Sequence, residues 1–321
     1  MKRIIATVGP SLLHKIKLTE VHNDRNIYRI NGAHGNINEI EQYILKIKSQ
    51  VDNAQILMDL PGNKVRTANF KDGFIDIKEN KEFILNFNQM NYKDFFKHLK
   101  IGDKVWANDS IFNFVVKSID FKQTEITFIS NSTGRLLNNK GMHVRGIHKG
   151  IPFLFRKDIE LIGLANKHKL DFVGLSFVRD ENDIKEAKKL IATSKIISKV
   201  ETLSAVENLE EILKEVEYIL IDRGDLSTEI GLSKVPSYQK FIIDKAIFYN
   251  RKVFLATQFL KSMEYNPIAT IPEVIDMYNT LKSGIYGIQM SEETAVGKYP
   301  KNCLDTICDL MNEIKEEGLP K

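Results

Sequence analysis

Eight short runs of apolar residues, spread along most of the chain, constrain the fold more than any other feature of the sequence. The runs are nearly continuous, as expected for parallel strands covered on both faces. Amphipathic segments follow most of them, for example 36–50 and 180–193, with Asp180 and Asn182 as candidate caps of the second. The strand candidates are 3–9, 26–31, 55–60, 172–177, 195–201, 218–223, 252–258 and 284–291. This alternation predicts an α/β fold, with a (β/α)8 TIM barrel favoured over an open doubly wound sheet.

Residues 67–148 interrupt the alternation. They contain short β-like pieces, such as "KVWAND" and "FNFVVKSI", separated by turn residues, and no helix-rich unit. Three strands cannot close a barrel alone, so we predict a small β-barrel lid domain inserted after the third barrel strand. The expected organisation is a barrel first part at 1–66, the inserted domain at 67–148 and a barrel second part at 149–321.

Composition narrows the classes of function. A net charge of +4 over 321 residues points to no nucleic-acid partner. Cys303 and Cys308 lie in one predicted helical segment, a spacing that suggests neither a disulfide framework nor a metal knuckle and favours a reducing compartment. No apolar run reaches the ~18 residues of a membrane span, and the N-terminal run is too short for a signal peptide. We therefore expect a cytoplasmic protein without a membrane partner.

Polar residues recur where the predicted strands end. The carboxyl ends of barrel strands form the site in folds of this kind, so seven consecutive polar strand ends indicate one shared site. These residues are Arg29, Asn31, Asp59, Ser176, Lys199, Glu201, Arg223, Gly224, Asp225, Thr257, Gln258, Ser291 and Glu293.

Two of these strand ends carry a pattern typical of a metal site. Lys199 and Glu201 are two apart on one strand and share a face, and Asp225 follows the next strand. Carboxylates on neighbouring strands suit Mg²⁺. The alternative is a cluster of structural salt bridges, Lys199 with Glu201 and Arg223 with Asp225.

A series of motifs resembles the pyruvate kinase family. In order along the chain they are "KRIIATVGPS", "YRINGAHG", "LMDLPGNKVRT", "KGMHVRG", "DFVGLSFVR", "ISKVET", "RGDLSTEI" and "MSEETAVGKYP". The resemblance covers nearly the whole sequence and implies a barrel with an inserted β-barrel lid. It also implies phosphoryl transfer from phosphoenolpyruvate to ADP, giving pyruvate and ATP. The chain ends after the last barrel helix, so we expect a short form without the family's C-terminal domain.

The resemblance assigns roles to matching residues. Glu201 and Asp225 match ligands of Mg²⁺ (or Mn²⁺), and Lys199 and Arg29 match groups that stabilise the enolate and the phosphoryl group. Thr257 and Ser291 match hydroxyls of the substrate pocket and proton path, with Ser176, Gly224 and Asp225 also on the substrate side. The residues on the nucleotide side are Arg66, His34 and Lys140. At the helix start, the backbone N–H groups of Gly224 and Asp225 are expected to face a carboxylate.

One group of residues departs from the family pattern around its monovalent cation. Asn31 and Asp59 match two cation ligands, but Ala33 and Leu60 stand where the family has serine and threonine. Lys64 replaces the glutamate of the "GPEIR" motif. Family members that do not need potassium resemble this chain in carrying that lysine. We hypothesise that Lys64 substitutes for the ion and that K⁺ is not required.

Asp222 is a second departure, because it replaces a small residue and adds negative charge near an anionic substrate. It motivates one alternative, an enzyme that uses the same site on a different acceptor or 2-oxo acid. A separate alternative is a catalytically impaired homologue that binds phosphoenolpyruvate or nucleotide as a regulatory protein. The expected partners are phosphoenolpyruvate or pyruvate, ADP or ATP, and a second copy in a homodimer formed through the barrel.

Overall fold

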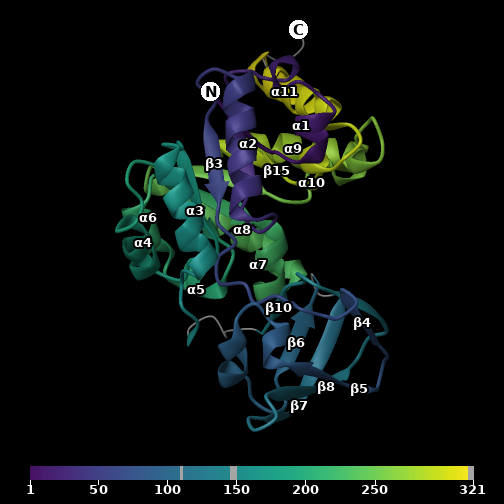
Figure 1. The fold of residues 1–321 in the computed structure, drawn as a ribbon. Helices are drawn as coiled ribbons and strands as arrows, with labels where there is room; N and C mark the ends of the chain where they lie inside the picture. Colours follow the sequence, from purple (N-terminus) through teal and green to yellow (C-terminus); the bar gives the residue numbers. More distant parts are fainter. Residues whose placement is uncertain (109–110, 145–149, 317–321) are drawn as a thin grey trace. The chain divides into compact units, whose positions relative to one another are not determined.

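The computed structural model describes residues 1–108, 111–144 and 150–316. The chain divides into two compact units (Figure 1), one comprising Met1–Gly62 with Leu154–Lys321 and the other Asn63–Phe153. The division after Gly62 falls a little before the expected boundary at residue 66. The expected boundary between 148 and 149 lies outside the described residues. Each unit is treated by itself below.

The first unit is a closed barrel of eight parallel strands, which confirms the predicted (β/α)8 fold. The hydrogen-bonded order is β1-β15-β14-β13-β12-β11-β3-β2, and β2 pairs back to β1. Each strand lies within one of the predicted apolar runs. The bounds are β1 Arg3–Thr7, β2 Asn26–Asn31, β3 Ile56–Asp59, β11 Phe172–Leu175, β12 Lys195–Val200, β13 Tyr218–Asp222, β14 Lys252–Ala256 and β15 Gly287–Met290.

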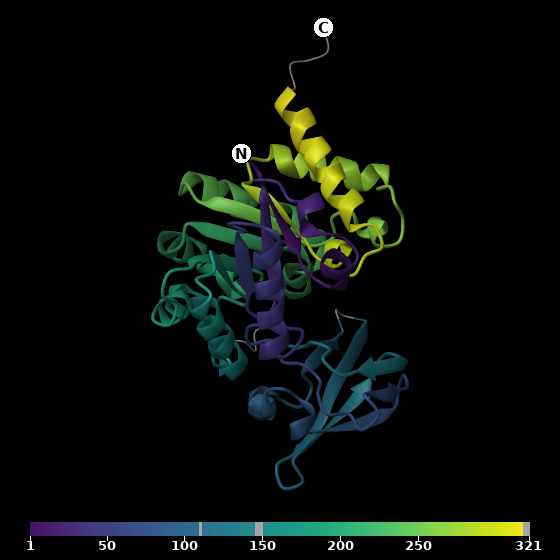
Figure 2. The same cartoon turned by 45° about the horizontal axis from the view of Figure 1, so that its top comes forward.

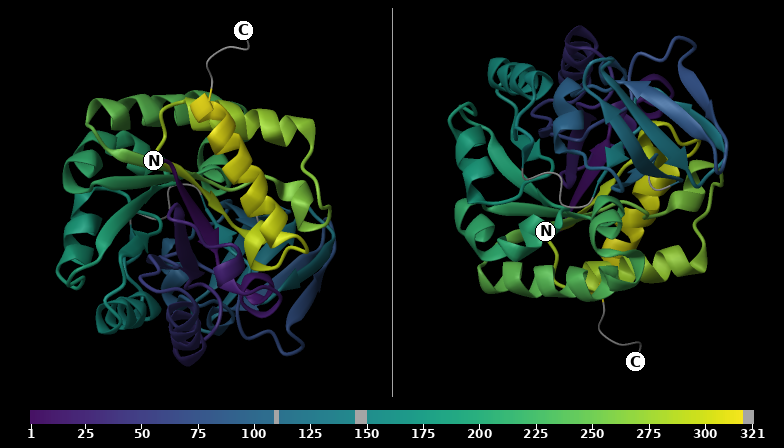
Figure 3. Two further views of the ribbon diagram at one scale, coloured as in Figure 1. Left: turned by 90° about the horizontal axis from the view of Figure 1, so that it is seen from above. Right: turned by 90° about the horizontal axis from the view of Figure 1, so that it is seen from below.

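Helices surround these strands (Figure 3), and α11 packs beside α9 (Figure 2). The bounds are α1 Pro10–His14, α2 Ile37–Gln50, α3 Arg156–Lys167, α4 Glu181–Lys188, α5 Leu203–Glu207, α6 Leu209–Glu215, α7 Arg223–Ile230, α8 Val235–Phe248, α9 Ile271–Lys282, α10 Glu292–Ala295 and α11 Pro300–Glu316. Among the described residues, no helix combines the length and apolar character needed to span a bilayer.

Local sequence explains where two of the predicted helices begin. Asn36 and Glu39 form a capping box at α2, each side chain accepting the other's backbone N–H. At α4 the Asp180 side chain accepts the N–H groups of Asn182 and Asp183, so Asp180 rather than Asn182 is the cap.

The inside of the barrel changes character from one end of the strands to the other. Away from the carboxyl ends of the strands, the inside is filled by a buried cluster, here called the barrel floor, and Tyr286 packs against this cluster. The floor consists of Ile5, Ile27, Leu57, Phe172, Ile197, Tyr218, Leu220, Phe254 and Ala256. Phe172 meets Tyr218 edge-on, with ring centroids 5.4 Å apart. Because side chains alternate between faces, the next inward positions on three strands are Arg29, Lys199 and Asp222. Apolar residues thus fill the floor, and charged ones line the carboxyl ends.

The second unit is antiparallel. Its described residues form a five-stranded sheet in the order β10-β6-β7-β8-β5 and a separate pair, β4-β9, rather than the single closed β-barrel expected. Its core includes the stacked rings of Phe83 and Phe128. The bounds are β4 Phe74–Ile77, β5 Glu82–Asn86, β6 Lys104–Ala107, β7 Phe112–Asp120, β8 Glu125–Ser130, β9 Gly134–Leu137 and β10 Met142–His143.

Candidate active site at the carboxyl ends of the barrel strands

Lys199 is the centre of the candidate site. It lies on β12 and is almost fully buried. Its Nζ lies 3.1 Å from Glu201 Oε2, 3.9 Å from Asp222 Oδ2 and 4.0 Å from Asp59 Oδ2. It also donates a 3.0 Å hydrogen bond to Ser176 Oγ. Burial alone would lower the pKa of this ammonium, but the attraction of the three carboxylates outweighs burial and holds the pKa above its ordinary value.

Glu201 follows β12 and is fully buried. Its Oε1 accepts the Phe177 N–H at 2.7 Å. Its Oε2 is close enough to Lys199 for an ion pair but accepts no hydrogen bond from any described residue. Burial raises the pKa of Glu201 above its ordinary value, Asp225 and Asp222 act in the same direction, and Lys199 opposes them. A buried carboxylate oxygen without a hydrogen bond, such as Oε2, is stabilised when a cation binds to it.

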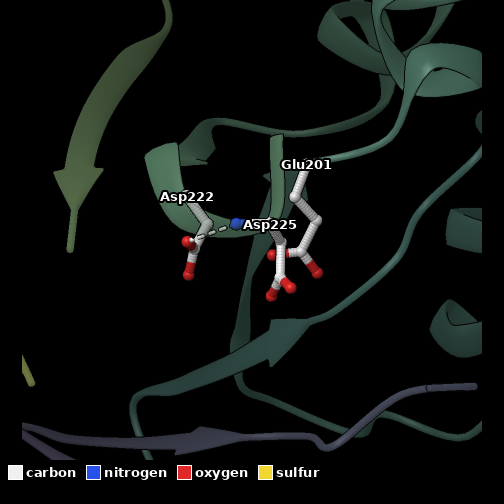
Figure 4. Close-up of side chains that lie close together, drawn as sticks. All are labelled: Glu201, Asp222 and Asp225. Carbon is white, nitrogen blue, oxygen red and sulfur yellow. Dashed lines mark hydrogen bonds between the residues drawn. The ribbon is translucent and has the colours of Figure 1, made fainter. Parts of the chain in front are cut away.

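Glu201, Asp222 and Asp225 form an acidic cluster (Figure 4). One oxygen from each lies within 4.8 Å of the others. Carboxylate oxygens are the donors that Mg²⁺ and Mn²⁺ prefer, and this set fits such an ion. Glu201 and Asp225 were predicted ligands, whereas Asp222 was noted only as a departure.

Charge also favours a divalent cation in the cluster. Among the described residues, these contacts bring together two cations and four acids: Arg29, Lys199, Asp59, Glu201, Asp222 and Asp225. The acids outnumber the cations in this set, which favours binding of a cation. Arg223 contributes no net charge, because it pairs with Asp276 at 2.9 Å and not with Asp225. Of the alternative salt-bridge pairs, the structure therefore contains only Lys199–Glu201.

Arg29, on β2, is held from two sides. Its Nε lies 2.7 Å from Asp59 Oδ2 on β3, and its NH1 donates to Thr7 Oγ1 at 2.7 Å. Thr7 in turn donates to the Met290 carbonyl at 2.6 Å. Sequence reasoning missed Thr7, although its position two residues after the inward-facing Ile5 was a usable signal.

The start of α7 brings Asp222, Gly224, Asp225 and Thr257 together. Asp222 caps this helix: its Oδ1 accepts the N–H groups of Gly224 at 3.1 Å and Asp225 at 3.3 Å. Thr257 Oγ1 lies 3.0 Å from the Gly224 nitrogen and 3.3 Å from the same Asp222 oxygen. Both N–H groups thus donate to a carboxylate of the chain itself.

Unusual backbone conformations mark two strand exits. Thr257 and Gln258 both have positive φ, +68° and +60°, after β14, and Phe177 has φ +57° after β11. A β-branched residue at positive φ is a genuine outlier, and such strain gathers at functional sites.

The substrate-side serines lie at different depths. Ser176 is buried and donates to the Leu60 carbonyl at 2.7 Å. Ser291 follows β15 at the start of α10, and its backbone N–H donates to Glu293 Oε2 at 2.8 Å. Glu293 is itself buried.

The remaining predicted residues divide between the units. Asn31 lies at the end of β2, where its Oδ1 accepts the Ala33 N–H, and His34 is exposed nearby. Arg66, Lys140 and Lys64 belong to the second unit. There Arg66 forms an antiparallel β-bridge with Gly141, and the Lys64 side chain lies against the same glycine. The backbone carbonyl of Lys140 accepts the Thr67 N–H. The structure thus brings these three cations onto neighbouring segments of one unit.

A shallow hollow elsewhere on the barrel is not this site. It is lined by Lys195, Glu217 and Tyr218, among others, and lies where β12 and β13 begin. That is the opposite end of these strands from Lys199 and Asp222, and none of the predicted site residues lines it.

The fold and the site define a (β/α)8 barrel that carries, at the carboxyl ends of its strands, an acidic cluster suited to binding a metal cation. The chain matches the family model described as "Pyruvate kinase, barrel domain" over residues 1–304. It is 34% identical to the pyruvate kinase of Thermotoga maritima, an alignment covering 98% of this chain and 71% of that protein. It is 30% identical to the pyruvate kinase of Staphylococcus aureus strain MRSA252, covering 95% and 55% respectively. The chain belongs to the pyruvate kinase family and spans only part of the length of these relatives.

Proposed function

We propose that this chain transfers the phosphoryl group of phosphoenolpyruvate to ADP, giving pyruvate and ATP. Membership of the pyruvate kinase family supports the reaction class. The observation that carries the proposal is Lys199, a buried ammonium within 4.0 Å of three carboxylates and beside the acidic cluster. Such a preorganised group stabilises charge that develops in a transition state.

The reaction breaks the bond between phosphorus and the enol oxygen and forms a bond from phosphorus to a terminal oxygen of ADP. Arg29, oriented by Asp59 and Thr7, attracts the phosphoryl oxygens. Lys199 stabilises the negative charge left on the enol oxygen. A proton then reaches the methylene carbon along a path that includes Thr257 and Ser291. Catalysis of this kind is largely positioning and electrostatic stabilisation.

Glu201 and Asp225 would hold Mg²⁺ or Mn²⁺. The bound ion would neutralise charge on substrate oxygens. Arg66 and Lys140 of the second unit are proposed to attract the nucleotide phosphates, and His34 of the first unit is proposed as a separate nucleotide-side residue.

The direct test is release of pyruvate, followed by coupling to NADH oxidation, with phosphoenolpyruvate, Mg²⁺ and a panel of nucleoside diphosphates. Lys240→Met is a matched control for lysine substitutions, because Lys240 is exposed and pairs only locally with Asp244. Pyruvate release that requires a nucleoside diphosphate supports the proposal. Release no faster than without protein would reject it.

A second candidate function is a binding protein with little catalysis. Asp222 favours weak catalysis rather than tight binding, because it adds a carboxylate to the cluster and occupies the donors at the start of α7. Binding of phosphoenolpyruvate or nucleotide without turnover would support this function instead.

A further inference from the structure

The start of α7 offers a small anion-binding arrangement that is already filled. The first N–H groups of a helix have no partners within the helix and attract negative charge. At α7 two of them, from Gly224 and Asp225, donate to Asp222 Oδ1, and Thr257 Oγ1 lies 3.3 Å from that oxygen. Figure 4 shows the Asp222 carboxylate turned toward the Asp225 nitrogen.

The other oxygen of Asp222 belongs to the site. Oδ2 lies 3.9 Å from Lys199 Nζ, and the carboxylate clusters with those of Glu201 and Asp225. The residue is only 7% exposed. Its carboxylate therefore joins the helix start to the candidate metal cluster, as a bound ligand carboxylate would.

Asp180 forms the same kind of helix cap at a place that is not part of the candidate metal site. At α4 its Oδ1 accepts the N–H groups of Asn182 at 2.9 Å and Asp183 at 3.3 Å, nearly the distances found at α7. Asp180 is not part of the acidic cluster described above. The two caps share local geometry and differ in whether they reach the candidate metal site.

We propose that Asp222 is an internal competitor: its carboxylate occupies the position that the carboxylate of a substrate or product would take. The inference rests on the proposed function, which makes the ligand an enol or 2-oxo acid. Two effects follow. The N–H donors of Gly224 and Asp225 are occupied before a ligand arrives, and the extra negative charge offsets the charge of a bound divalent cation. Small carboxylates therefore bind this chain more weakly than they bind a chain without the competitor.

The test measures binding of oxalate, a small ligand with adjacent carboxylates, by calorimetry with saturating Mg²⁺ and again without metal. The variants are Asp222→Ala, Asp222→Asn and the matched cap control Asp180→Ala. Asp222→Ala vacates the donors and removes the charge, so oxalate should bind about 10-fold more tightly or better. Asp222→Asn keeps an oxygen for the cap and removes only the charge, so its affinity should lie between those of wild type and Asp222→Ala.

An equal oxalate affinity in wild type and Asp222→Ala would overturn the inference, and so would an equal gain in Asp180→Ala. If Asp222→Ala fails to fold, as judged by circular dichroism, the Asn variant decides: a tighter affinity supports the competitor and an unchanged one rejects it. The proposed function is judged separately, by pyruvate release from the wild type. Its failure leaves the comparison of oxalate affinities intact.

Discussion

Arg29 and Asp59 form a buried ion pair across neighbouring barrel strands, with Arg29 Nε 2.7 Å from Asp59 Oδ2. Asp59 was predicted as a remnant ligand of a monovalent cation, and its Oδ2 has Arg29 as a partner, whereas its Oδ1 is buried and makes no hydrogen bond with a described residue. Asn31, the other remnant ligand, holds the Ala33 N–H. The Arg29 guanidinium thus supplies one positive charge beside these two remnant ligands.

We predict that any phosphoryl transfer is independent of K⁺, as the hypothesis for Lys64 requires. Rates should be equal in tetramethylammonium buffer and after KCl is added at constant ionic strength, which holds screening fixed. Strong stimulation by K⁺ would contradict the hypothesis. The triple variant Lys64→Glu, Ala33→Ser and Leu60→Thr should acquire K⁺ dependence, and a folded triple variant indifferent to K⁺ would argue that the lysine does not replace the ion.

Removing a cluster carboxylate should weaken metal binding. We expect Asp225→Ala to bind Mg²⁺ or Mn²⁺ at least ~10-fold more weakly than wild type, because loss of even an indirect metal contact has effects of that order. Isothermal calorimetry measures this, with Asp180→Ala as a control that removes an aspartate from outside the cluster. Equal affinities for wild type and Asp225→Ala would exclude Asp225 as a ligand.

Lys199→Met should lower the rate of phosphoryl transfer by ~10²-fold or more, the usual effect of deleting one preorganised electrostatic contact. The substitution also removes the buried cation beside Glu201, Asp222 and Asp59, of which Asp59 keeps its pair with Arg29. Removing one partner of a buried ion pair destabilises a protein by roughly 3–5 kcal/mol. Urea unfolding should accompany the kinetic assay, so that loss of charge is separated from loss of fold. Activity within a few-fold of wild type in the folded variant would assign Lys199 a structural role.

Glu293 should make stability depend on pH. Burial raises its pKa to about 7 from 4.5, so the folded protein binds a proton that the unfolded chain has released between these values. Its contribution is fully present below pH ~4.5 and is lost as pH rises through about 7. Glu293→Gln keeps an oxygen for the Ser291 N–H and removes the titration.

The free energies of unfolding of wild type and Glu293→Gln should be compared by urea titration at pH 5 and pH 8. Relative to wild type, the variant should gain roughly 2–3 kcal/mol on going from the lower to the higher pH. The other buried acids are common to both proteins and cancel in this difference. A difference between the proteins that does not change with pH would mean that Glu293 keeps an ordinary pKa.

The positions of the strands were predictable because both faces of each are covered and their apolar runs are nearly continuous. The convergence of Arg29, Lys199 and Asp225 was predictable because parallel strands bring their carboxyl ends to one side of the barrel. The direction of the Asp222 side chain was not anticipated. The signal was present, since an aspartate directly before a helix start is a strong cap. Its second contact, with Lys199, depends on barrel packing that local sequence does not encode.

The second unit was less predictable. Its antiparallel strands were recognised as short β-like pieces, but their pairing depends on contacts distant in sequence. Strand β7, for example, has a register irregularity between Val116 and Ser118 in its pairing with β8. Alternation of apolar and polar residues does not specify such a shift.

The aromatic floor of the barrel has an electrical consequence for the charges above it. Phe172, Tyr218 and Phe254 pack as close rings, a layer of low dielectric constant next to Lys199 and Glu201. Water cannot screen the charges from that side, so their field is stronger than it would be above a hydrated layer. Thus the apolar half of the barrel, which makes no contact with a ligand, helps to set how fast charged ligands arrive.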